Sequence, residues 1–220
     1  MRSTVFLFLL PALLMAQGPR EDDAESLHIV NANLDFKPGW TLQLHSRVRT
    51  FENMSSFNQF RAGPILMVQL RPRLLGLAGY YFIDQNRRVT YQDFHVHRVW
   101  LGAQVRAVQR PRWTMDARTV TERFISSEFT DYYRFRNRLM INGNGNGNGR
   151  KWLPFISYEV LRQQERWYGR FTAGTQYRPA PGLLTSLGYE YRPSPIGSPS
   201  HILATMIQFE RIRRIPPHID

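Results

Sequence analysis

Polar and apolar residues alternate along most of this chain, in segments of roughly ten residues. The segment YYRFRNRLMI at 132–141 places Tyr133 and Phe135 on one face of an extended strand and Arg134 and Arg136 on the other. Strands of globular proteins usually run for about 5–6 residues, whereas a tilted strand that crosses a bilayer needs about 9–11. The pattern therefore predicts an all-β fold, an antiparallel up-and-down transmembrane β-barrel with apolar side chains toward lipid and polar side chains toward the lumen. A water-soluble ligand-binding barrel would show the same alternation with the two faces exchanged, so periodicity alone leaves that alternative open.

The number of strands follows from the segments that alternate. Ten strands, counted with short turns on the periplasmic side, give the even number of bacterial outer-membrane barrels and leave both chain ends in the periplasm. Segment 27–36 is also strand-like, and it is an eleventh strand, half of a further hairpin, or a stretch packed in the lumen. We predict an N-terminal segment at 17–39, a barrel of ten strands at 40–211, with twelve strands as the alternative, and a C-terminal tail at 212–220. The ten alternating segments are 40–50, 58–69, 74–83, 94–106, 112–124, 132–141, 152–161, 166–177, 183–192 and 200–211.

Residues 1–16 are typical of a secretory signal peptide. Arg2 supplies a positive charge, and an apolar run from Val5 to Met15 follows it. This run is too short for a helix that spans a bilayer, which needs about 20 residues. We therefore predict export through the periplasm to the outer membrane of a bacterial cell. The chain contains no cysteine, which excludes disulfides and cysteine-ligated metal sites.

Short and longer connections alternate between the predicted strands. KPG at 37–39 and RPR at 71–73 are short, whereas DQNRRVTYQD at 84–93 is long. Outer-membrane barrels show this division, with short periplasmic turns and longer external loops. Tryptophans begin strands after short turns and tyrosines gather toward the opposite ends, so we predict two aromatic girdles at the membrane interfaces. The predicted girdle residues are Trp40, Trp113, Trp152, Tyr133, Trp167, Tyr189 and Tyr191.

The chain is strongly basic, with a net charge of +12. Of its 29 basic residues only Lys37 and Lys151 are lysines, and planar guanidinium groups suit confined sites better than flexible ammonium groups do. Cations in the short turns either lie beside anionic lipid headgroups or are ordinary solvated turn residues. We expect no nucleic-acid partner, because the chain is predicted to be exported and carries neither a block of basic residues nor a known reader motif.

Charged residues recur at alternate positions on the predicted inner face, and the cations outnumber the carboxylates. One interpretation is a ladder of arginine–carboxylate pairs that holds a narrow barrel together, because buried charges must be paired. Another is a cationic lumen that selects small anions or binds an acidic ligand such as a lipid headgroup. The predicted lumen charge network consists of Arg98, Asp116, Arg118, Glu122, Arg134, Arg136, Arg138, Glu159, Arg166, Arg170 and Glu190.

A third interpretation is an outer-membrane hydrolase. His95 and His97 share one face of a predicted strand, and Ser126, Ser127 and Glu128 follow in a nearby loop. A Ser–His–acid set could assemble from these residue types, but no G-x-S-x-G motif supports it. Two histidines without a third ligand do not define a metal site. We therefore predict no catalytic residues, no metal and no cofactor.

Several short motifs follow one another along the chain, namely RAGP at 61–64, LAGYY at 77–81, HRVW at 97–100, ARTVTERF at 117–124, YRFRNRL at 133–139, SYE at 157–159, RFTAG at 170–174 and LGY at 187–189. In this order and spacing they resemble the DUF2490 family of bacterial outer-membrane β-barrels. The resemblance covers nearly all of the chain after the signal peptide. It implies the fold and the location, and it implies no catalytic residues, because the function of the family is undefined.

The run NGNGNGNG at 142–149 does not belong to this family pattern. Asn-Gly is the favoured pair for a two-residue hairpin turn, because both residues accept positive φ. One pair would be enough, and four in tandem offer several nearly equivalent turns. We predict an overlong hairpin tip without fixed structure at 143–148.

Overall fold

The computed structural model describes residues 23–86, 93–144, 152–193 and 199–210. In these ranges the chain forms eleven β-strands. No helix within them is long and apolar enough to cross a membrane. The predicted signal peptide, the predicted C-terminal tail and most of the Asn-Gly run lie outside the described residues. The strands are β1 (Asp23–Lys37), β2 (Trp40–Phe51), β3 (Ser56–Arg71), β4 (Leu74–Asn86), β5 (Asp93–Gln109), β6 (Trp113–Ile125), β7 (Tyr132–Gly143), β8 (Trp152–Gln163), β9 (Arg166–Ala180), β10 (Leu183–Arg192) and β11 (Ser200–Phe209).

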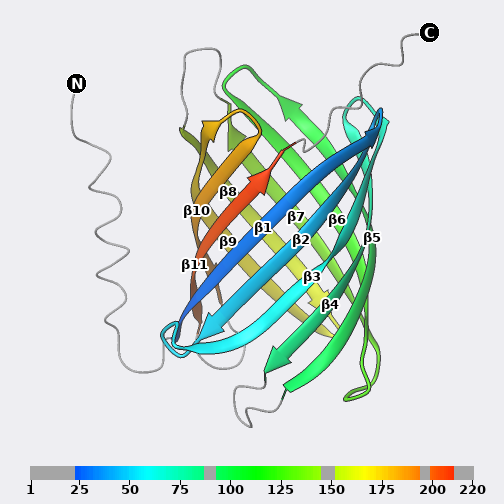
Figure 1. Ribbon diagram of the computed structural model, residues 1–220, viewed down its shortest axis with the longest axis vertical. Helices are drawn as coiled ribbons and strands as arrows, with labels where there is room; N and C mark the ends of the chain where they lie inside the picture. The colour runs from blue at the N-terminus through cyan, green and yellow to red at the C-terminus, as the bar shows by residue number, and fades with distance from the viewer. Residues whose placement is uncertain (1–22, 87–92, 145–151, 194–198, 211–220) are drawn as a thin grey trace, which may run out of the picture.

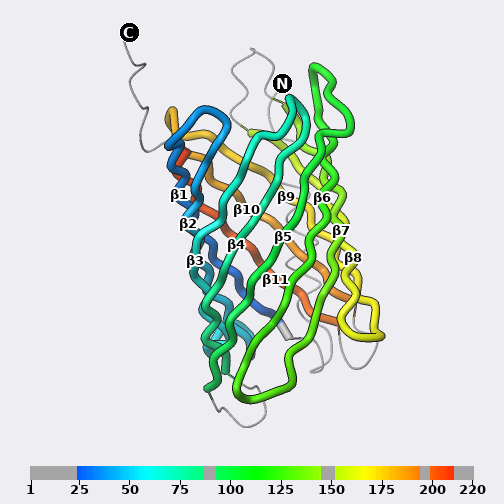
Figure 2. The backbone as a smooth tube through the Cα atoms, turned by 90° about the vertical axis from the view of Figure 1, so that its right-hand side faces the viewer, coloured from blue at the N-terminus to red at the C-terminus, as the bar shows by residue number. Residues whose placement is uncertain are grey.

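The strands form one closed barrel in which each strand pairs with its neighbours in the sequence (Figure 1). All of these neighbouring pairs are antiparallel, and the barrel closes between β1 and β11, which pair in parallel. The strands run obliquely to the long axis of the barrel (Figure 2). Closure requires such a tilt, and it leaves no unpaired sheet edge.

Both predicted strand numbers, ten and twelve, are wrong, because the barrel has eleven strands. The strand-like segment 27–36 belongs to β1, which lies in the wall between β2 and β11, so the barrel begins before residue 40. An odd number also changes the position of the chain ends. Asp23 lies opposite Ser200 and Ala32 opposite Phe209, so β1 starts at the end of the barrel where β11 starts, not where β11 ends. The expectation that both ends of the barrel chain lie on the same side is therefore wrong as well.

The wall alternates between a buried inner face and an exposed outer face. In β5, Val96, Arg98 and Trp100 are buried, whereas Val99 and Leu101 are exposed. The strands are 10 to 17 residues long. Each strand carries at least one large apolar side chain that is exposed on the outside, for example Val30, Leu44, Leu70, Tyr80, Leu101, Trp113, Phe135, Ile156, Phe171, Leu187 and Leu203.

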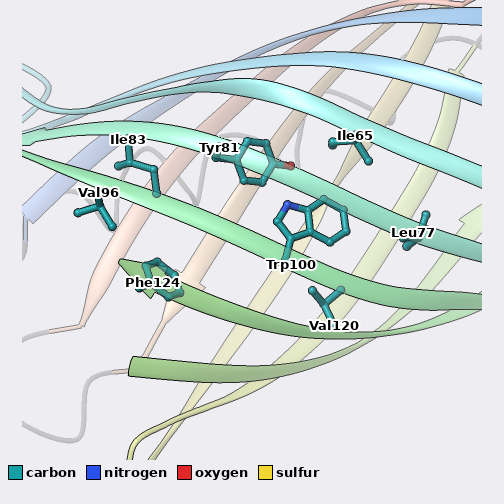
Figure 3. Close-up of a cluster of buried hydrophobic side chains, with 8 residues drawn as sticks. All are labelled: Ile65, Leu77, Tyr81, Ile83, Val96, Trp100, Val120 and Phe124. Atoms are coloured by element: carbon teal, nitrogen blue, oxygen red, sulfur yellow. The ribbon is translucent and has the colours of Figure 1, made fainter. Parts of the chain in front are cut away.

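A cluster of apolar side chains fills part of the interior, against the wall formed by β3 to β6 (Figure 3). Tyr81 and Trp100 stack with their ring centroids 5.9 Å apart. Because these side chains point into the interior, the cluster narrows the lumen on this side of the barrel. Its members are Ile65, Leu77, Tyr81, Ile83, Val96, Trp100, Val120 and Phe124.

Gly79 provides the space that Trp100 occupies, because a Cβ atom at this position would overlap the indole ring. We expect Gly79→Ala to lower the free energy of unfolding by about 1–3 kcal/mol, the usual cost of overpacking a filled core. Urea unfolding of the refolded protein in detergent micelles measures this cost. Gly169→Ala is the matched control, because its added Cβ would lie 3.4 Å from the Tyr158 hydroxyl, an ordinary contact. Equal unfolding midpoints for the two variants would contradict the close packing of Trp100 on Gly79.

Candidate functional site: an arginine-lined interior cavity

Glu122 is the centre of the buried charge cluster, and its side chain is 0% exposed. Its Oε2 accepts a hydrogen bond of 2.5 Å from Arg134 Nε. Its Oε1 lies 3.0 Å from Arg136 Nη2 and 3.5 Å from Arg98 Nη1. Adjacent strands supply these groups, because Arg98 lies on β5, Glu122 on β6 and both other arginines on β7. One carboxylate therefore neutralises part of the charge of three guanidinium groups.

Glu159 extends this cluster around the barrel. Its Oε2 lies 3.4 Å from Arg136 Nη1, and its Oε1 lies 3.3 Å from Arg170 Nη1. Arg136 thus bridges Glu122 and Glu159, and six of the eleven predicted network residues form one continuous chain from β5 to β9. The six are Arg98, Glu122, Arg134, Arg136, Glu159 and Arg170.

Two predicted network residues lie farther along the barrel, toward the short turns. Asp116 does not join the Glu122 cluster, because its register places it opposite Arg106, with which it forms an ion pair of 3.0 Å. Arg118 lies with its guanidinium 5.2 Å from the centre of the Trp100 ring. Both side chains face the interior, but their contacts lie outside the Glu122 cluster.

The remaining three predicted network residues also lie outside the chain of ion pairs around Glu122 and Glu159. Glu190 forms an ion pair with Arg192 on the same strand. Arg138 lies opposite Glu159 in register, and Arg166 lies opposite Gln163 at the start of β9. Among the residues that the structure describes, no ion pair joins Arg138 or Arg166 to a carboxylate.

Four arginines of the interior were not in the predicted network, namely Arg47, Arg49, Arg61 and Arg192. Arg47 and Arg49 alternate with the apolar Val48 in segment 40–50, so the sequence contained a signal for their position on the inner face. Arg49 forms an ion pair with the fully buried Glu25 of β1. That partner was missed because β1 begins at Asp23, before the predicted strand-like segment 27–36.

Arg61 contacts a histidine instead of a carboxylate. Its Nη2 lies 3.0 Å from His45 Nε2, and His45 Nδ1 lies 2.8 Å from Asn31 Oδ1. A guanidinium nitrogen can only donate, so His45 Nε2 accepts and Nδ1 carries the proton that His45 donates to Asn31. His45 is therefore neutral in this arrangement. Arg61 and Arg98 also lie 4.5 and 4.4 Å from the centre of the Tyr81 ring, at a distance at which cations are attracted to aromatic rings.

These side chains surround a cavity of about 320 Å³ inside the barrel, toward the end where β6 and β7 are joined. No carboxylate is among the residues that line it. The cavity is cationic for this reason, although carboxylates lie behind several of its arginines. Its eight lining arginines are Arg47, Arg49, Arg61, Arg98, Arg134, Arg136, Arg170 and Arg192, and its other lining residues are Gln59, Ile83, Gln85, Phe94, Val96, Phe124, Phe129, Tyr132 and Gln163.

The predicted girdle residues lie near the ends of their strands. Trp40, Trp113 and Trp152 each begin a strand at the end of the barrel with the short turns. Tyr133 and Trp167 lie near the opposite end, with more than half of each side chain exposed. Tyr189 is exposed and Tyr191 half-buried, and both have rings close to His201. Whether these side chains lie at membrane interfaces stays a prediction.

His95 and His97 lie on the outer face of β5 and not in the cavity. The Tyr80 hydroxyl and His97 Nδ1 are 2.7 Å apart, and His95 Nδ1 lies 3.3 Å from Asp84 Oδ1. Ser126 donates a hydrogen bond to the backbone carbonyl of His95, so its hydroxyl shapes the loop. The described residues contain no group of three or more histidine, aspartate or glutamate side chains placed to hold a metal ion.

The fold and the interior define an all-β closed barrel with a cationic cavity. The chain belongs to the family described as "Protein of unknown function (DUF2490)", which matches residues 25–196. No curated protein matches it. A solved structure of the NanC porin, in a rhombohedral crystal form, is similar with a TM-score of 0.49 and 10% sequence identity, over 77% of this chain and 87% of that chain.

Proposed function

We propose that this chain is a bacterial outer-membrane β-barrel that forms a narrow, anion-preferring pore. The observation that carries the proposal is the cavity lined by eight arginines and no carboxylate. Rings of cationic side chains are the usual means by which a pore favours anions.

The outer surface supports a location in a membrane. Each strand exposes large apolar side chains, whereas charged side chains gather inside, which reverses the arrangement of a water-soluble barrel. Soluble monomers rarely expose such a continuous apolar surface. The strands, at 10 to 17 residues, are also long enough to cross a bilayer with a tilt, which takes about 9–11.

The pairing of the interior charges supports a preference for anions in addition to a structural role. A ladder whose only role is to hold the wall together would pair each buried arginine with a carboxylate. Arg49, Arg98, Arg134, Arg136, Arg170 and Arg192 have such partners. Among the described residues, Arg47 and Arg61 have none and bind Gln59 and His45 instead. Two cations of the cavity therefore retain charge that can attract an anion.

Conductance in a planar bilayer tests the proposal. We expect the refolded chain to open small, steady conductance steps, and a potassium chloride gradient across the bilayer to give a reversal potential of the sign for chloride permeation. The reason is that uncompensated guanidinium charge raises the local concentration of anions and lowers that of cations. Inserted protein that is silent, or that prefers potassium, would contradict the pore. Bilayers treated with detergent alone are the control.

A further inference from the structure

The cavity contains aromatic rings as well as arginines. Four aromatic rings line one side, and they come from β5, β6, the connection after β6 and the start of β7. Phe124 and Tyr132 stack nearly in parallel, with ring centroids 4.6 Å apart. Phe129 lies 5.6 Å from Tyr132 and 6.2 Å from Phe94, centroid to centroid. These rings offer apolar surface inside a charged space, with Phe94 and Phe129 edge to face and the guanidinium groups of Arg134 and Arg98 over the Phe124 ring.

Arg47 and Arg61 line the same cavity from β2 and β3, where they lie directly opposite each other in register. Like charges in this position repel each other and destabilise a sheet. The Nε atoms of both arginines are buried and have no hydrogen-bond partner. A buried donor without an acceptor is costly, more so when it is charged. An anionic group held between the two guanidinium groups would relieve the repulsion and supply acceptors.

We infer that the cavity binds a compact organic anion, namely a carboxylate or phosphate group carried on a flat apolar body such as one aromatic ring. The anionic group binds Arg47 and Arg61, whose planar forks match carboxylate and phosphate oxygens. The flat body packs against Phe129 and its aromatic neighbours. A volume of about 320 Å³ lies at the small end of the range for ligand pockets, about 300–1,000 Å³, which favours a single ring over a larger ligand.

This inference rests on the proposed function, because it names the class of anion that the cationic interior takes. Binding is measured on the full refolded chain in detergent micelles by isothermal titration calorimetry, with titrations into protein-free micelles subtracted. Three probes are compared. Phenyl phosphate carries both an anionic group and an aromatic ring, inorganic phosphate carries only the anionic group, and benzyl alcohol carries only the ring. We expect phenyl phosphate to bind at least about tenfold more tightly than either of the others.

Two variants separate the two sides of the cavity. Phe129→Ala should reduce the affinity for phenyl phosphate to about that for inorganic phosphate, and leave the latter unchanged. Arg47→Gln combined with Arg61→Gln should weaken the binding of both phosphates by at least about tenfold. This double variant is expected to fold, because it removes two like charges that face each other. Arg178→Gln is the control, since Arg178 pairs with Glu210 away from the cavity and its loss should leave binding unchanged.

Three results would overturn the inference. They are equal affinities for phenyl phosphate and inorganic phosphate, tight binding of benzyl alcohol alone, and unchanged binding in the double arginine variant. If a variant does not refold, the wild-type chain is used instead. Phenylglyoxal modifies accessible arginines, and phenyl phosphate should protect Arg47 and Arg61 from it, as measured by mass spectrometry. Unprotected arginines would overturn the inference. Failure of the proposed pore is a separate result, because a silent or potassium-preferring barrel is detected by conductance whatever the calorimetry shows.

Discussion

Replacing Glu122 with glutamine should lower the free energy of unfolding by roughly 3–5 kcal/mol, the usual cost of removing one partner from a buried ion pair. The substitution keeps the size of the side chain and removes only its charge. Arg98 and Arg134 then lose their only carboxylate partner among the described residues, while Arg136 keeps Glu159. Urea unfolding of the refolded chain in detergent micelles, followed by tryptophan fluorescence, measures the loss.

Glu210→Gln is the matched control for this loss. Glu210 also pairs with an arginine, but Arg178 is 47% and Glu210 27% exposed, so we expect an effect below about 1 kcal/mol. A double-mutant cycle with Arg134→Gln adds a second check. If Glu122 acts by neutralising the cluster, the double variant should lose less stability than the sum of the single variants. Additive losses, or a Glu122 variant as stable as the Glu210 variant, would mean that the cluster does not hold the wall together.

The kind of fold could be predicted from the sequence, and the number of strands could not. The alternation in 132–141 and its counterparts predicts long strands with two unlike faces, which is a local property. β1 pairs with β2 through a short turn, but whether this hairpin strand also closes the barrel depends on its contact with β11 at the other end of the chain. Local periodicity carries no information on such a contact. The even number usual among bacterial outer-membrane barrels then favoured ten strands over the eleven that the barrel has.

In the candidate site, too, the local sequence pattern predicts some features, and the strand register alone decides others. Alternation predicts that Asp116 and Glu122 share the inner face, but only the strand register decides which arginine each one meets. Register shifts within pairs, such as the one between Arg106 and Val108, move these partners along the barrel. Asp116 therefore meets Arg106, and Glu122 meets the arginines of β7. The opposition of Arg47 and Arg61 across β2 and β3 is likewise a property of register, so the sequence pattern could not reveal it.

Leu101→Arg should lower the stability of the barrel in lipid vesicles by about 2–4 kcal/mol, the cost of a cation on the lipid-facing side of a barrel at the bilayer midplane. Leu101 lies at the middle of β5 and is 68% exposed. On a surface in water the same change would stay within about 0.5 kcal/mol. The difference between these outcomes therefore tests whether the apolar exterior lies in lipid. Urea unfolding in phospholipid vesicles, with folded and unfolded chains separated by gel mobility, gives the value.

Leu70→Arg is the matched control, because Leu70 is 59% exposed and lies one residue before the end of β3. Near the bilayer interface the cost of an arginine falls to about 0–1 kcal/mol, since its long side chain reaches the headgroups. We therefore expect the Leu101 variant to be clearly less stable than the Leu70 variant in vesicles. If both variants unfold at the urea concentration of the wild type, the exterior is not in contact with lipid hydrocarbon. The outer-membrane assignment would then be wrong, and a water-soluble ligand-binding barrel would explain the cationic cavity better than a pore does.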